Sequence, residues 1–244
     1  MTVSERAVAP PYVDGPAIGM AVQFVLLGAL GTVVGLGAAG WLTGTAYALV
    51  TCVLLTRALR RSGTNLLGPA NQVTLARATL VGGVAALVAD AVLTPASIGV
   101  LVALASVALA LDGVDGQVAR RTGSTSALGA RFDMEVDAFL VLVLSVLVAG
   151  TLGWWVLAIG LFRYVFVAAA WTMPWLNGAL PPRFSRKTVA AVQGIALVVA
   201  AAGVLPQVLA FALVGAALAS LIWSFGRDVV WLWHHRYTWT PAPA

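Results

Sequence analysis

Acidic side chains are rare in this chain and are concentrated in one stretch. The 244 residues include nine Asp and Glu, and five of these lie between Asp112 and Asp137. Apolar runs border the stretch on both sides, one beginning near Ala96 and the other continuing to Gly160. Carboxylates where membrane helices reach the interface cost free energy, so their grouping indicates a functional site.

The spacing of the four aspartates suits metal binding. Asp112 and Asp115 are three residues apart, and Asp133 and Asp137 are four apart, so on helices each pair shares one face. Four converging carboxylates would repel one another strongly unless a cation lay among them. A set of oxygen ligands with no His or Cys nearby favours a hard divalent ion such as Mg²⁺, Mn²⁺ or Ca²⁺.

Glycines and arginines accompany these acids. Gly116 and Arg120 continue the face of the first aspartate pair, and Gly129 precedes the second pair on its own face. A glycine lets another group approach the backbone closely. Arg120, Arg121 and Arg131 are interleaved with the acids and could hold phosphate oxygens.

The stretch resembles the signature of the CDP-alcohol phosphotransferase (CDP-alcohol phosphatidyltransferase) family, D-x2-D-G-x2-A-R-x8-G-x3-D-x3-D. All eight fixed positions match with the correct spacers, and the resemblance covers about Asn71 to Arg227. The matching residues are Asp112, Asp115, Gly116, Ala119, Arg120, Gly129, Asp133 and Asp137.

This resemblance implies an activity and a set of roles. The expected reaction moves a phosphatidyl group from CDP-diacylglycerol, or a related CDP-linked donor, to an alcohol acceptor, releases CMP and serves phospholipid biosynthesis. Two divalent ions, Mg²⁺ or Mn²⁺, would be held by the four aspartates, and Asp137 would also be the general base. Gly116, Ala119, Arg120 and Gly129 would contact nucleotide or phosphate. We expect a homodimer.

A polar stripe opens the family-like region. Asn71, Thr74 and Arg77 recur at three-residue intervals at the start of an expected helix. Family members commonly carry a similar pattern near the nucleotide site, which makes these three residues candidates for nucleotide or phosphate binding. The alternative is that Asn71 caps the helix and Arg77 extends to the interface.

The acceptor alcohol stays open. The phosphatidylglycerol-phosphate synthase branch continues as DPxADK, whereas this chain has Met134 and Ala138 at the Pro and Lys positions. Glu135 is an additional acid that would point away from the face shared by Asp133 and Asp137.

Composition places the chain in a membrane. Hydrophobic residues make up 61% of it and charged residues 9%, which indicates a polytopic, all-α membrane protein. The net charge of +5 fits loops that face anionic lipid, and we expect no nucleic-acid partner. The single cysteine, Cys52, excludes an internal disulfide.

Apolar runs predict eight membrane helices. A polar tail at 1–15 precedes an additional hairpin at 16–57, whose spans of roughly 17–35 and 40–57 meet at a glycine-rich turn. The family-like domain at 71–227 holds six spans, at roughly 72–91, 96–115, 133–152, 154–173, 188–204 and 207–226. Residues 228–244 form an expected interfacial tail.

Charge predicts the orientation of these spans. The connections near 36–39, 91–95, 151–153 and 204–206 contain no Lys or Arg, whereas the opposite side holds most of the basic residues. The positive-inside rule then places the aspartates and both termini in the cytoplasm of a multi-pass protein of the cell membrane.

Five further basic residues are candidate ligands of the acceptor. They are Arg131, Arg163, Arg183, Arg186 and Lys187. Arg163 lies well inside a span, where it would bind an anion in a polar cavity or, alternatively, join two helices. Arg183, Arg186 and Lys187 would bind a phosphate-bearing substrate or, alternatively, anchor the helix end at the cytoplasmic face.

Two other functions compete with transfer. A transporter would use the carboxylate cluster to bind a coupling cation, but the acids lie toward one side of the membrane and no inverted repeat is visible. A family relative without catalytic activity would act as a membrane scaffold. The complete set of four aspartates argues against this function.

Overall fold

Eight α-helices form the protein in a computed structural model that describes residues 15–62, 69–91, 98–122, 127–178, 180–181 and 184–236. The side chains at 62, 69–70, 115–122, 127 and 184 lie outside the described part of the chain. The helices are α1 (Gly15–Val34), α2 (Ala38–Ser62), α3 (Pro69–Ala91), α4 (Ile98–Thr122), α5 (Ala127–Leu152), α6 (Leu157–Thr172), α7 (Phe184–Ala201) and α8 (Gln207–His234). Short 3-10 helices, Trp154–Val156 and Pro174–Asn177, flank α6.

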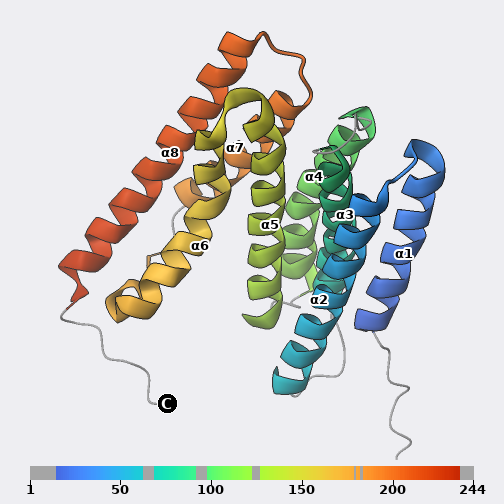
Figure 1. Ribbon diagram of the computed structural model, residues 1–244. Helices are drawn as coiled ribbons and strands as arrows, with labels where there is room; N and C mark the ends of the chain where they lie inside the picture. Colours follow the sequence, from blue (N-terminus) through green and yellow to red (C-terminus); the bar gives the residue numbers. More distant parts are fainter. Residues whose placement is uncertain are drawn as a thin grey trace, which may run out of the picture.

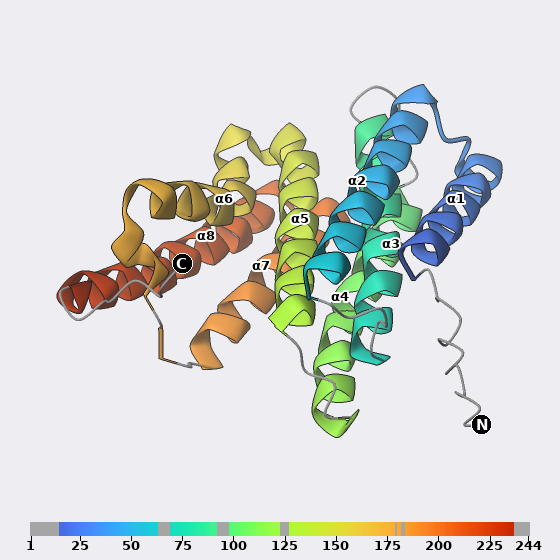
Figure 2. The same cartoon turned by 90° about the horizontal axis from the view of Figure 1, so that it is seen from below.

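Helix α3 is the centre of the bundle. It packs against α1, α2, α4 and α5, and 67% of its apolar window is buried, against 22% for both α1 and α2. Figures 1 and 2 show α1 and α2 on one side of α3, and α6, α7 and α8 grouped beyond α5. The first helix of the family-like region is thus enclosed by both the additional hairpin and the remaining helices.

Small residues let the hairpin approach α3 closely. A Cβ atom at Gly82 would lie 2.6 Å from Tyr47 Cδ1 of α2 and 2.6 Å from Gln23 Oε1 of α1, so any side chain there would displace these two neighbours. A Cβ at Gly40 of α2 would lie 3.0 Å from the Ala86 carbonyl of α3. Close backbone approach at small residues is the usual way in which membrane helices gain dispersion contacts.

A carboxylate also fastens the hairpin to α3. Asp90 is 8% exposed near the end of α3, and it accepts hydrogen bonds from the backbone N–H groups of Gly37 (2.6 Å) and Gly40 (3.1 Å) at the start of α2. The first N–H groups of a helix have no partner within it, and negative charge at that end is favourable. Asp90 therefore caps α2 from a different helix.

The eight predicted helices are present, and the described residues contain no strand. Six helical segments are long and apolar enough to cross a membrane, and they fall on α1, α2, α3, α5, α6 and α8. The apolar part of α4, Ile98–Val114, is shorter, and α7 has 18 residues. The prediction of an all-α, polytopic membrane bundle is confirmed.

Three predicted breaks are tight turns at glycines with positive φ. Gly35, Gly153 and Gly203 have φ values of 71°, 104° and 65°, a region that disfavours other residues. They join α1 to α2, α5 to α6 and α7 to α8 at one end of the bundle, the upper end in Figure 1. Placement of these connections at one end agrees with the alternation of the predicted spans.

Several helices continue beyond the apolar runs that predicted them. The structure carries α2 to Ser62, α4 to Thr122 and α8 to His234, although the sequence predicts spans that end near 57, 115 and 226. Hydropathy detects only the part of a helix in the membrane, whereas Ala, Gln and Arg extend helices readily in water. The signature residues up to Arg120 therefore lie on α4 rather than in a loop.

Candidate active site

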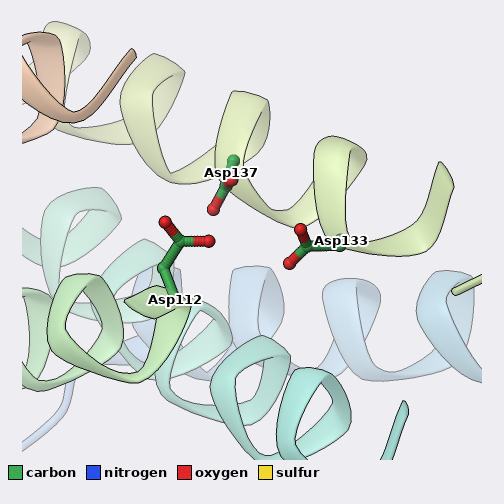
Figure 3. Close-up of side chains that lie close together, drawn as sticks. All are labelled: Asp112, Asp133 and Asp137. Carbon is green, nitrogen blue, oxygen red and sulfur yellow. The ribbon is translucent and has the colours of Figure 1, made fainter. Parts of the chain in front are cut away.

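Three aspartates from two helices meet at one pocket. Asp112 lies on α4, and Asp133 and Asp137 lie one turn apart on α5, with all three carboxylates directed toward the space between the helices (Figure 3). One carboxylate oxygen from each falls within 4.8 Å of the other two. The pocket has a volume of about 510 Å³ and is lined by α4, α5, α6, α7 and α8.

The guanidinium of Arg77 joins the three carboxylates. Its side chain on α3 is fully buried, and Nη1 donates to Asp112 Oδ1 at 2.8 Å. Nη2 lies 2.6 Å from Asp137 Oδ1 and 2.6 Å from Asp133 Oδ1, and it also donates to the Asp133 backbone carbonyl at 3.3 Å. A buried charge needs paired and hydrogen-bonded partners, and these acids supply them.

The polar stripe on α3 is buried along its length. Asn71 is 7% exposed and Thr74 is 3% exposed, so neither faces lipid or water. Arg77 does not extend to the interface, because its side chain turns inward to the aspartates. Arg77 thus contacts the three aspartates of the site. Binding of nucleotide or phosphate by Asn71, Thr74 and Arg77 stays a prediction.

Two predicted cations line the aspartate pocket. Arg163 of α6 forms an ion pair with Glu135 of α5 and contacts the Met134 sulfur. Lys187 of α7 is exposed, and the described part of the chain offers it no ion-pair partner. The pocket thus combines three carboxylates on one wall with two positive side chains on others.

Other predicted residues lie elsewhere or outside the described part of the chain. Arg131 lines a different groove, between α2 and α5. Arg186 lies 3.4 Å from Asp228 of α8, and it donates to the Pro181 carbonyl. Gly129 is buried in the first turn of α5. The side chains of Asp115, Ala119 and Arg120, the surroundings of Gly116, and all of Arg183 fall outside what the structure describes.

Gln193 is a pocket residue that the sequence interpretation missed. It is 2% exposed on α7 and donates to the Ala217 carbonyl (2.8 Å) and Ser220 Oγ (3.2 Å) of α8. Its signal was a single amide within an apolar run, AAVQGIAL. Such a residue in a membrane helix usually joins two helices, and here it holds α7 against α8 beside the site.

The donor set fits a divalent cation. Asp112, Asp133 and Asp137 contribute only carboxylate oxygens, which Mg²⁺ and Mn²⁺ prefer. Arg77 shows that the same oxygens gather around positive charge at 2.6–2.8 Å. All three carboxylates are partly exposed, at 34–42%, so a soluble ion can reach them from the pocket.

Comparison with known proteins assigns the chain to a family. The family model for CDP-alcohol phosphatidyltransferase matches residues 67–223, which span α3 to most of α8 and include every aspartate of the site. No curated protein and no solved structure matches the chain. The match leaves α1 and α2 outside the family region. Because the match covers more than half of the chain, the protein belongs to the CDP-alcohol phosphatidyltransferase family.

Proposed function

We propose that the protein transfers a phosphatidyl group from CDP-diacylglycerol to an alcohol and releases CMP. The observation that carries the proposal is the convergence of Asp112, Asp133 and Asp137 on one pocket that opens beside Lys187 and Arg163. A pocket of about 510 Å³ lies within the usual range of roughly 300–1,000 Å³ for small-molecule sites. The family match favours this transfer over cation transport.

Asp112, Asp115 and Asp133, with Asp137, would hold one or two Mg²⁺ or Mn²⁺ ions. When bound, the metal neutralises the pyrophosphate of the donor and makes its phosphorus more electrophilic. Positively charged side chains of the protein would also attract the negative charge of the pyrophosphate. Lys187 and Arg163 line the pocket and would attract the phosphate groups of donor or acceptor.

Asp137 would act as the general base. The acceptor hydroxyl attacks the β-phosphorus, and its proton passes to the Asp137 carboxylate as the new P–O bond forms. The bond from that phosphorus to the bridging oxygen breaks, and CMP leaves with this oxygen. Asp137 is 39% exposed and close to both other carboxylates, so it reaches the pocket and the metal ligands together.

Arg77 would position the carboxylates. Its guanidinium contacts three side chains that come from two helices, so it fixes the distance between α4 and α5 at the site. Arginine suits this role because its donors form a rigid planar fork. Asn71 and Thr74 lie on the same buried stripe and would place the nucleotide.

The proposal is tested by CMP release from purified full-length protein. The protein is incubated with CDP-diacylglycerol and Mg²⁺, alone and with a panel of alcohols that includes glycerol phosphate, inositol phosphate and serine. The proposed transfer predicts CMP release that depends on one alcohol, together with a matching phospholipid. Absence of CMP and of product with every alcohol, in protein that binds the donor, contradicts it.

A further inference from the structure

A second groove lies on the other side of α5 from the aspartates. It has a volume of about 830 Å³ and is lined by α2, α5 and Tyr164 of α6. None of its lining residues lines the aspartate pocket. One wall is the additional hairpin, so the groove depends on α2, which lies outside the family region.

The floor of this groove is apolar and aromatic. Tyr47 of α2 stacks on Phe139 of α5 with ring centroids 5.1 Å apart. Val50 and Leu54 of α2 are 55% and 59% exposed, although they lie within the apolar span Ala38–Arg61. An acyl chain that packs on this part of the groove would be removed from water and would gain dispersion contacts with the protein.

The opening of the groove is basic. Arg57 and Arg61 lie one turn apart near the end of α2, and Arg131 lies on α5 across from them. All three side chains are exposed, and none has an ion-pair partner in the described part of the chain. The acid in the groove, Glu135, is paired with Arg163.

This combination fits one class of ligand. Guanidinium groups bind phosphate through parallel hydrogen bonds, and basic pockets between membrane helices bind anionic lipid headgroups. A free phosphate would leave the apolar floor uncovered, and an uncharged lipid would leave three guanidinium groups without a partner. We propose that the groove between α2 and α5 binds an anionic phospholipid, with its phosphate at Arg57, Arg61 and Arg131 and an acyl chain along Tyr47 and Phe139.

This site goes beyond the proposed function, because its occupant need not react. The additional hairpin would give the protein a second lipid site, apart from the aspartate pocket proposed for the donor. Direct binding therefore tests the site without any measurement of transfer, and CMP release can fail or succeed independently of it.

The test uses full-length protein in detergent, with phosphatidic acid as the probe and phosphatidylcholine of the same acyl chains as the comparison. Bound lipids are counted by native mass spectrometry, and affinity is measured by titration. We expect phosphatidic acid to bind at least tenfold more tightly than phosphatidylcholine. Inorganic phosphate at millimolar concentration should not displace it.

Matched variants locate the site. Arg61→Gln and Arg131→Gln should each weaken phosphatidic acid binding by about fivefold or more, whereas Arg60→Gln, on the same turn but outside the groove, should not. Val50→Trp should fill the floor and exclude the lipid. Val53→Trp, exposed on α2 but away from the groove, is its control.

Four results would overturn the proposal. Equal affinity for phosphatidic acid and phosphatidylcholine would show that the arginines do not favour an anionic headgroup. An effect of Arg60→Gln as large as that of Arg61→Gln would show general attraction to a basic surface. Full displacement by inorganic phosphate, or unchanged binding in Val50→Trp, would show that no acyl chain occupies the floor.

Discussion

Arg77 is the residue on which the geometry of the site depends most. It is fully buried and contacts three carboxylates at 2.6–2.8 Å. Removal of one partner from a buried ion pair costs about 3–5 kcal/mol when the remaining charge is enclosed. The carboxylates are 34–42% exposed, so water screens them and the loss should fall toward the lower end of that range.

We therefore predict that Arg77→Gln lowers the thermal unfolding temperature in chelator, because three carboxylates then face one another without the guanidinium. Mg²⁺ should restore much of the loss and should stabilise this variant more than it stabilises the unchanged protein. Thermal unfolding in detergent across a Mg²⁺ titration measures both effects. If the unfolding temperature of Arg77→Gln does not change with Mg²⁺, the carboxylates do not share a metal site.

A second prediction at this scale separates Asp137 from the other aspartates. Asp137→Asn removes the proton acceptor but keeps the size and one oxygen of the side chain. Donor binding should stay within about tenfold, or 1.4 kcal/mol. Turnover should fall by ~10²–10⁴, the usual contribution of a positioned general base.

Donor binding and CMP release, each measured across a Mg²⁺ titration, decide the role of Asp137. Persistent inactivity with donor bound is the predicted result. Recovery of the rate of Asp137→Asn at high Mg²⁺ would instead identify Asp137 as chiefly a metal ligand.

Among the elements, α3 connects the two parts of the molecule. It supplies Arg77 to the site and, one residue before its C-terminal end, Asp90 to the start of α2. Asp90→Ala should destabilise the protein by about 1–3 kcal/mol, because two helix N–H groups lose a buried acceptor. Thermal or denaturant unfolding of the purified protein checks this value.

Gly40→Ala should also destabilise the packing of α2 on α3, here by steric crowding rather than by loss of a hydrogen-bond acceptor. The added methyl would lie 2.5 Å from Leu36 Cδ1 and 3.0 Å from the Ala86 carbonyl of α3, so Leu36 must shift and α2 must move slightly away from α3. Gly28→Ala is the matched control, since it lies in the same hairpin with no atom within 4 Å of the new methyl. Equal stability of the two variants would mean that α2 does not depend on close approach to α3.

The helices and the aspartate cluster could be predicted because their signals are local. The apolar runs predicted the number of helices, and the spacing of Asp112, Asp133 and Asp137 can be read directly from the sequence. The partners of Arg77 could not be predicted, because 35 and 60 residues separate it from Asp112 and Asp137. The pairing depends on how α3, α4 and α5 pack, which no local pattern records.

The same limit applies to the pairs that join other helices. Glu135 was expected to point away from the metal face, and it does, but Arg163 as its partner follows only from the packing of α6 on α5. Arg131 lies in the signature stretch with the aspartates, but it lines the groove between α2 and α5 rather than the aspartate pocket. Its role in acceptor binding stays a prediction.

The distribution of charge along the chain predicts the orientation of the protein in the membrane. Basic residues gather at the end opposite the three glycine turns, so the signature region should face the cytoplasm. In a Cys52→Ala background, Ser124→Cys should react with an impermeant thiol reagent only after cells are opened, whereas Trp154→Cys should react in intact cells. The reverse pattern would contradict the orientation.

If the aspartate cluster performs metal-dependent transfer from a CDP-linked donor, CMP release must depend on both the metal and the carboxylates. CMP release is followed with CDP-diacylglycerol and the active alcohol for the unchanged protein, Asp133→Asn and Asp90→Asn, each with Mg²⁺ and with excess chelator. We expect CMP release only with Mg²⁺, none from Asp133→Asn, and release from Asp90→Asn, whose carboxylate lies away from the pocket. Full turnover in chelator, or by Asp133→Asn, would contradict this expectation.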